Sequence, residues 1–91
     1  NSGHMEHAAF SSLGLGRALR AERRALGLTQ QAVADATGYR RQTIVDLEAG
    51  RNVSLQTLFA ALGALGKGLR LVDARPDPDR LSALLDPPDE D

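Results

Sequence analysis

The chain has 91 residues, which is enough for one small domain whose margin of stability is thin. It lacks cysteine and any apolar run near the roughly 20 residues that cross a bilayer, which excludes disulfides, thiolate metal sites and a membrane partner. The net charge of −1 conceals an asymmetry, because residues 12–75 carry ten Arg and Lys against five acids, whereas residues 76–91 carry one Arg against six acids. A body with a net charge of +5 has the electrostatic footprint that phosphate binding needs.

Residues 1–11 are expected to form a disordered lead. Its first residues read as the scar of an expression tag, with Met5 as the native start. No signal-peptide pattern is present, so the cytoplasm is the expected compartment. Both histidines of the chain, His4 and His7, fall in this lead, and we expect neither a metal site nor a cofactor.

The first predicted helix covers about residues 13–26, with Ser12 as its N-cap and Gly27 just after its end. Three leucines near helical spacing form its apolar stripe: Leu15, Leu19 and Leu26.

Residues 28–50 read as two short helices joined by a tight turn at Gly38. Thr29 is expected to cap the first of them, and the second covers about Arg40 to Ala49. Their small apolar interior consists of Ala32, Val33, Ala36, Ile44 and Leu47. This layout is a helix-turn-helix, whose second helix enters the major groove of DNA.

The polar residues of this segment gather at the two helix starts, where a duplex would be met. Arg41 suits a bidentate contact with guanine and Gln42 one with adenine, while Gln30 suits a phosphate or an adenine edge. Arg40 and Thr43 are better placed for phosphates. The predicted DNA-binding residues are therefore Thr29, Gln30, Arg40, Arg41, Gln42 and Thr43.

The fourth predicted helix follows Ser54 as its N-cap and ends at Gly66 and Gly68. Its apolar face has the i, i+3, i+4, i+7 spacing of an amphipathic helix and consists of Leu55, Leu58, Phe59, Leu62 and Leu65.

The period changes to alternation over residues 69–75, which predicts a single strand of about five residues. A single strand cannot satisfy its own backbone hydrogen bonds. Either the segment is an extended, hydrated coil, or it pairs with the same strand of a second copy. In the second case the dimerisation residues are Leu69, Arg70, Leu71, Val72 and Asp73.

Residues 76–91 form an acidic tail that holds all four prolines, a composition typical of disorder. One apolar patch at residues 81–85 interrupts it. The tail is a solubilising end, a segment that orders when its Leu81, Leu84 and Leu85 dock on a partner, or an acidic arm that competes with DNA for the basic face.

No catalytic constellation is visible, because the chain has no cysteine, no histidine outside the lead, no phosphate-binding glycine loop and no paired acids on one predicted face. We therefore expect a protein that is not an enzyme.

Residues 15–65 resemble the XRE (Cro/C1-type) helix-turn-helix family. The resemblance is carried by Arg23, Gly27-Leu28-Thr29-Gln30, Val33-Ala34, Gly38, Thr43-Ile44 and Leu47-Glu48-Ala49-Gly50. It implies an all-α bundle of about five short helices, in which Gln30, Arg41 and Gln42 face DNA. It also implies an internal ion pair between Arg23 and Glu48.

The resemblance extends to about residue 75, where a short L-x-L-V-D strand follows the helical body as in HipB-type antitoxins. It implies that residues 12–75 are one domain that dimerises through an intermolecular two-stranded sheet. The implied function is a repressor that binds a palindromic operator, controls its own operon and partners a HipA-like kinase toxin. The alternatives are a free-standing or phage-type repressor and a protein-interaction module that lost DNA binding.

Overall fold

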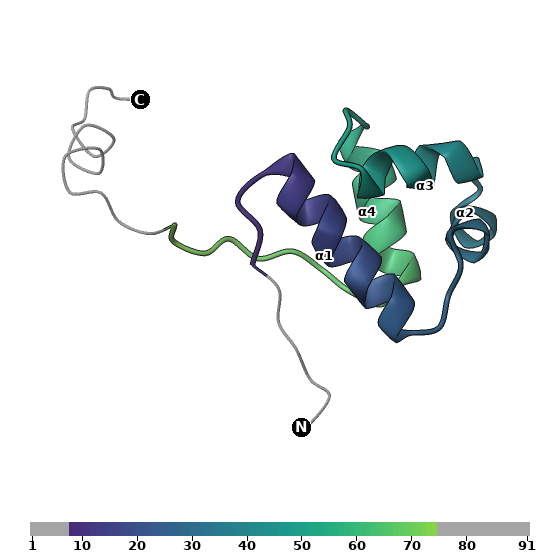
Figure 1. Ribbon diagram of the computed structural model, residues 1–91, viewed down its shortest axis with the longest axis horizontal. Helices are drawn as coiled ribbons and strands as arrows, with labels where there is room; N and C mark the ends of the chain where they lie inside the picture. Colours follow the sequence, from purple (N-terminus) through teal and green to yellow (C-terminus); the bar gives the residue numbers. More distant parts are fainter. Residues whose placement is uncertain (1–7, 75–91) are drawn as a thin grey trace.

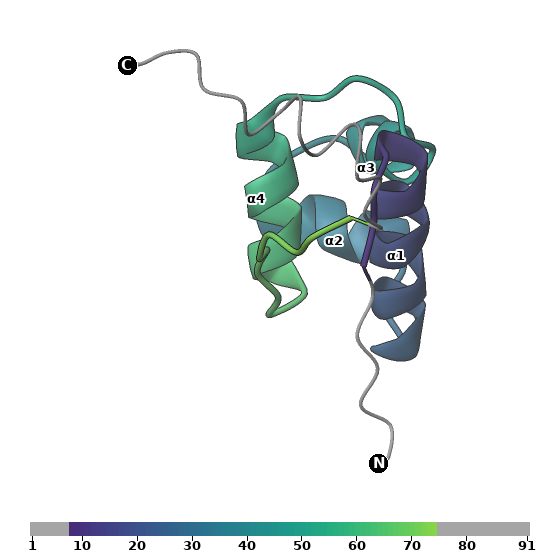
Figure 2. The same cartoon turned by 90° about the vertical axis from the view of Figure 1, so that its left-hand side faces the viewer.

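The computed structural model describes residues 8–74, which form an all-α domain. Its helices are α1 (Ser12–Ala25), α2 (Gln30–Thr37), α3 (Arg41–Glu48) and α4 (Leu55–Ala64). Helix α2 contacts both α3 and α4, and α1 packs on α3, so the four helices enclose one core (Figures 1 and 2). None of the helices in this part of the chain is both long and apolar enough to cross a membrane.

Hydroxyl side chains set the starts of three of the helices. Thr29 accepts a hydrogen bond from the backbone N–H of Ala32, and Ser54 accepts one from Thr57, as the sequence predicts for N-caps. At α1 the cap is Ser11 instead of the predicted Ser12, a shift of one residue. Helix α3 differs, because Arg40 is its N-cap residue and makes no side-chain capping bond.

The core is formed mainly by leucine and small aliphatic residues. Its buried members are Leu19, Val33, Ala34, Ile44, Leu47, Leu58, Ala61, Leu62 and Leu65. The predicted apolar face of α4 divides, because Leu55 and Phe59 are 72% and 53% exposed while the small Ala61 takes a core position. Leu26 and Ala36 were also expected inside and are exposed.

Two glycines allow α1 to approach the end of α3 closely. A Cβ at Gly16 would lie 2.5 Å from the carbonyl oxygen of Glu48 and 2.7 Å from that of Leu47. Gly50 has φ +80° and would place a Cβ 2.7 Å from the Cα of Leu13. The main chains of the two helices thus touch where any side chain would hold them apart.

The expected five-helix bundle with a C-terminal strand is wrong for the described residues. Four helices are present between residues 8 and 74, and residues 67–74 are irregular after α4. The reason is that a lone strand cannot satisfy its own backbone hydrogen bonds: within residues 8–74 no other segment pairs with residues 69–74 in a backbone ladder. The apolar patch at residues 81–85 and the ends, 1–7 and 75–91, lie outside the described residues.

Candidate nucleic-acid interface

The turn between α2 and α3 has the geometry that the sequence predicts. Gly38 adopts φ +80° and ψ 7°, the left-handed conformation that glycine adopts without strain, and its N–H bonds to the carbonyl of Ala34. The chain then runs through Tyr39 and the extended Arg40 into α3 (Figure 1). The starts of α2 and α3 thereby approach each other, as a side-chain contact between Gln30 and Arg41 shows.

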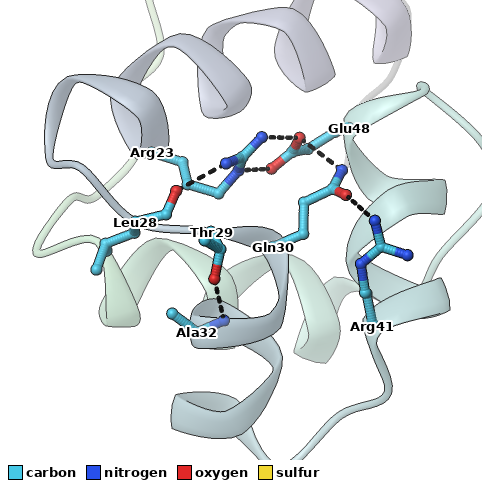
Figure 3. Close-up of polar contacts among 7 residues, drawn as sticks. All are labelled: Arg23, Leu28, Thr29, Gln30, Ala32, Arg41 and Glu48. Atoms are coloured by element: carbon cyan, nitrogen blue, oxygen red, sulfur yellow. Dashed lines mark hydrogen bonds and ion pairs between the residues drawn. The ribbon is translucent and has the colours of Figure 1, made fainter.

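An ion pair joins Arg23 on α1 to Glu48 at the end of α3. The guanidinium donates from Nε to Oε2 at 2.6 Å and from Nη2 to Oε1 at 3.0 Å, and its Nη1 also donates to the carbonyl of Leu28 at 2.8 Å (Figure 3). Only 10% of the Arg23 side chain and 6% of the Glu48 side chain are exposed. This bidentate geometry ties three segments of the chain to one buried point.

A chain of hydrogen bonds runs from that ion pair to the surface. Gln30 donates from Nε2 to Oε1 of Glu48 at 3.1 Å, and its own Oε1 accepts from Nη2 of Arg41 at 3.2 Å (Figure 3). Gln30 is half-buried and Arg41 is exposed. The structure thus brings together two of the residues predicted to face DNA.

The other predicted DNA-binding residues occupy different environments. The hydroxyl of Thr29 is used as the cap of α2 and accepts from Ala32 at 2.9 Å. Arg40 is exposed and Thr43 is half-buried in the first turn of α3. The backbone N–H groups at the start of α3 have no side-chain cap, and such groups attract anions.

Gln42 is exposed on α3 and donates from Nε2 to Oδ1 of Asp46 at 3.0 Å. Asp46 also accepts from Nη1 of Arg51 at 2.9 Å. These two hydrogen bonds, with the positive charge of Arg51, hold the pKa of Asp46 below its ordinary value. The aspartate therefore stays ionised and orients the amide of Gln42.

A shallow groove of about 400 Å³ lies beside the start of α2. Arg24 from α1 and Arg41 from α3 contribute to its walls, together with Thr29 and Gln31. Two guanidinium groups beside a helix N-terminus favour negatively charged ligands.

The segment predicted to dimerise, residues 69–73, is exposed and carries no backbone ladder. Leu71 is 99% exposed, and about half of Leu69 and of Val72 is exposed. Within residues 8–74 these apolar side chains are not part of the hydrophobic core.

The comparison with family models decides the family. The helix-turn-helix model matches residues 19–72, which is more than half of the chain. The chain belongs to the helix-turn-helix family. Its helical body is a DNA-binding domain of the XRE type. No curated protein matches the chain.

Solved structures of similar fold include HipB. A variant of HipB described as an O2 20mer complex superposes with a TM-score of 0.72 at 29% identity, over 78% of this chain and 100% of that one. A HipB–O4 20mer complex gives 0.71 at 30% identity, over 77% and 100%. A chain described as "MDT Protein" gives 0.70 at 30% identity, over 77% and 100%. This chain is therefore similar to HipB over the whole length of the two HipB chains.

Sequence reasoning missed the links that organise this surface. The sequence predicts Gln30 and Arg41 as two separate DNA contacts. It does not reveal that the Gln30 amide bonds to both Arg41 and Glu48. It also missed the role of Asp46, although the i, i+4 spacing from Gln42 to Asp46 was a usable signal. The close approach at Gly16 had no local signal, since its partners lie more than thirty residues away.

Proposed function

We propose that the protein is a sequence-specific transcriptional repressor. The observation that carries the proposal is the surface formed by the starts of α2 and α3, where Arg41 is held by Gln30 beside the exposed Arg40 and an uncapped helix N-terminus. Arg41 and Gln42 read base edges in the major groove, and Arg40, Thr43 and the start of α2 contact phosphates. Occupation of a promoter by the protein would block transcription sterically.

The second part of the proposal is the biological role, an antitoxin that represses its own operon and partners a HipA-like kinase toxin in the cytoplasm. Its support is the similarity to HipB structures at 29–30% identity over 77–78% of this chain and 100% of theirs. The DNA-binding domain is taken as residues 12–75 and the acidic tail as residues 76–91. A regulator of this class needs no catalytic residue and no cofactor.

The third part is a homodimer on a palindromic site. Two copies set two recognition helices about one helical turn, roughly 34 Å, apart. The exposed apolar side chains of residues 69–73 are the proposed contact, because burial against a second copy would remove them from water. Sedimentation at tens of micromolar tests this part, and a monomer at that concentration would reject it.

The decisive experiment is a mobility shift on the protein's own promoter, with Arg41→Ala and Arg40→Ala as variants. Arg41→Ala should reduce the free energy of binding to the promoter by roughly 1–3 kcal/mol, because it removes a bidentate base contact. It should also relax the sequence preference at one base pair. Arg40→Ala should weaken binding to all DNA sequences evenly. It should lower the slope of log affinity against log salt concentration by about one.

Equal losses on promoter and random DNA for Arg41→Ala would reject base readout by this residue. Purification of the protein with the product of the neighbouring gene tests the toxin. A protein that binds its promoter and captures no kinase would be a free-standing repressor.

A further inference from the structure

We infer that Asp46 is a specificity-determining residue, whose carboxylate accepts a hydrogen bond from the exocyclic amino group of a cytosine in the major groove. The inference rests on the proposed function, because it needs α3 to lie in that groove. Asp46 adds a third base contact to those of Arg41 and Gln42, one turn further along α3 from Gln42. Its ligand is a hydrogen-bond donor on a base edge.

The buried residues of α3 show which face of the helix is turned outward. Ile44, Leu47 and Glu48 are buried. The opposite stripe of the helix carries Gln42 and, four residues later, Asp46. The amide of Gln42 donates from Nε2 to Oδ1 of Asp46 at 3.0 Å, so the two side chains lie next to each other on this stripe. A duplex that meets Gln42 on this face therefore meets Asp46 as well.

The carboxylate of Asp46 keeps one oxygen available. Gln42 and Arg51 both donate to Oδ1, and no side chain among residues 8–74 donates to Oδ2. The side chain is 33% exposed, so a ligand can approach it from solvent. The hydrogen bonds from Gln42 and Arg51 lower the pKa of the carboxyl, which stays ionised and can only accept. Oδ2 is thus an acceptor on the outward face of α3 that the described part of the fold does not use.

The four bases differ in what they offer to such an acceptor in the major groove. Guanine presents two acceptors, N7 and O6, and thymine presents the acceptor O4 beside a methyl group. Adenine offers its N6 amino group, but the neighbouring acceptor N7 would repel a carboxylate. Cytosine offers its N4 amino group and has no acceptor of its own on that edge. An ionised aspartate therefore favours cytosine over the other three bases.

Arg51 offsets the repulsion between this carboxylate and the phosphates of DNA. Its Nη1 lies 2.9 Å from Oδ1 of Asp46, and 63% of its side chain is exposed. The pair has no net charge, and the remaining donors of the guanidinium are open to a phosphate. Arg51 would thus contribute affinity for DNA of any sequence, whereas Asp46 would choose one base.

The test is the selection of binding sites from duplexes with a randomised stretch, by the wild type and by variants. Asp46→Ala removes the acceptor, whereas Asp46→Asn keeps its shape and supplies an amide that suits adenine. We expect cytosine at one position of each wild-type half-site, adenine there for Asp46→Asn, and no preference there for Asp46→Ala. Circular dichroism checks that each variant is folded, and Asp46→Asn decides the matter if Asp46→Ala is not.

Asp35→Ala is the matched control. Asp35 is exposed and accepts from Gln31 at 2.9 Å with the same i, i+4 spacing, but it lies on α2. This variant should select the wild-type consensus. A second control, Arg51→Ala, should weaken binding to every duplex evenly and leave the preferred base at each position unchanged. A loss of the same cytosine in Asp35→Ala would overturn the assignment to Asp46.

Affinities for the selected site measure the size of the effect. Replacing the cytosine and its partner by a thymine–adenine pair should weaken wild-type binding at least about fivefold, and binding of Asp46→Ala less than about twofold. The inference is overturned if Asp46→Ala selects the wild-type consensus, or if the position that it relaxes holds a base other than cytosine. Failure of the wild type to select any consensus would reject the proposed sequence-specific function, and the inference with it.

Discussion

At the scale of single residues, the main polar contact of the interior is the ion pair between Arg23 and Glu48. A buried ion pair adds less stability than its Coulomb energy suggests, since both charges lose their hydration. Removing one partner is a different matter, because the other charge is left buried and unpaired. Loss of Arg23 would also disturb the hydrogen bond from Gln30, because Glu48 accepts that bond as well.

Arg23→Ala should lower the free energy of unfolding by about 3–5 kcal/mol, a large part of the stability of a small domain. Urea denaturation followed by circular dichroism measures the change. Lys67→Ala is the control, because Lys67 pairs with Glu22 at 3.2 Å but is 43% exposed, and the loss there should stay below about 1 kcal/mol. Similar losses for the two variants would contradict the special status of the buried pair.

Asp46 makes a prediction about pH. Its pKa in the folded protein lies below the ordinary value of 3.8, mainly because Gln42 and Arg51 donate to the ionised carboxylate. The carboxylate therefore contributes stability above the ordinary pKa, and that contribution disappears as the pH falls through the lowered pKa. Asp46→Asn should flatten the fall in melting temperature below pH ~4. Parallel pH profiles of the two proteins would show that Asp46 has no such linkage.

Helix starts were predicted well at the scale of elements, because an N-cap is a local event: Thr29 and Ser54 bond within their own first turns. The prediction of a strand was wrong because the stability of a strand depends on a partner, which the local pattern of residues 69–75 does not reveal. The same limit applies at the candidate site. The resemblance implies the Arg23–Glu48 pair, but the amide bridge from Glu48 to Arg41 depends on how the start of α2 packs against both ends of α3.

Gly16 tests the packing of α1 on α3. In Gly16→Ala the new Cβ would meet main-chain atoms at 2.5–2.8 Å, and a backbone carbonyl cannot move aside as a side chain can. The free energy of unfolding should fall by about 1–3 kcal/mol or more. Gly63→Ala is the matched control, because a Cβ at that helical site meets nothing within 4 Å and should stabilise by up to about 1 kcal/mol. Two variants with equal effects would contradict the close approach.

Charge is distributed unevenly over the whole molecule, and this bears on DNA affinity. Residues 12–75 carry a net +5 while residues 76–91 carry −5, so the overall charge understates the attraction of the domain for phosphates. Three of the basic residues, Arg17, Arg20 and Arg24, are exposed on α1, and Arg40 and Arg41 are exposed at the start of α3. Long-range attraction depends on the sum over the chain, including the tail.

A chain ending at Arg75 should therefore bind DNA more tightly than the full chain. The full chain has a net charge of −1 and residues 76–91 contribute −5, so residues 1–75 alone have a net charge of +4. The gain should be largest at low salt and fade once the Debye length drops below roughly 10 Å, near 0.1 M salt. Mobility shifts at several salt concentrations measure it. A matched chain with the tail acids changed to Asn and Gln should show the same gain, because charge and not length is responsible. A gain that is independent of salt, or that only truncation produces, would mean that the tail acts sterically.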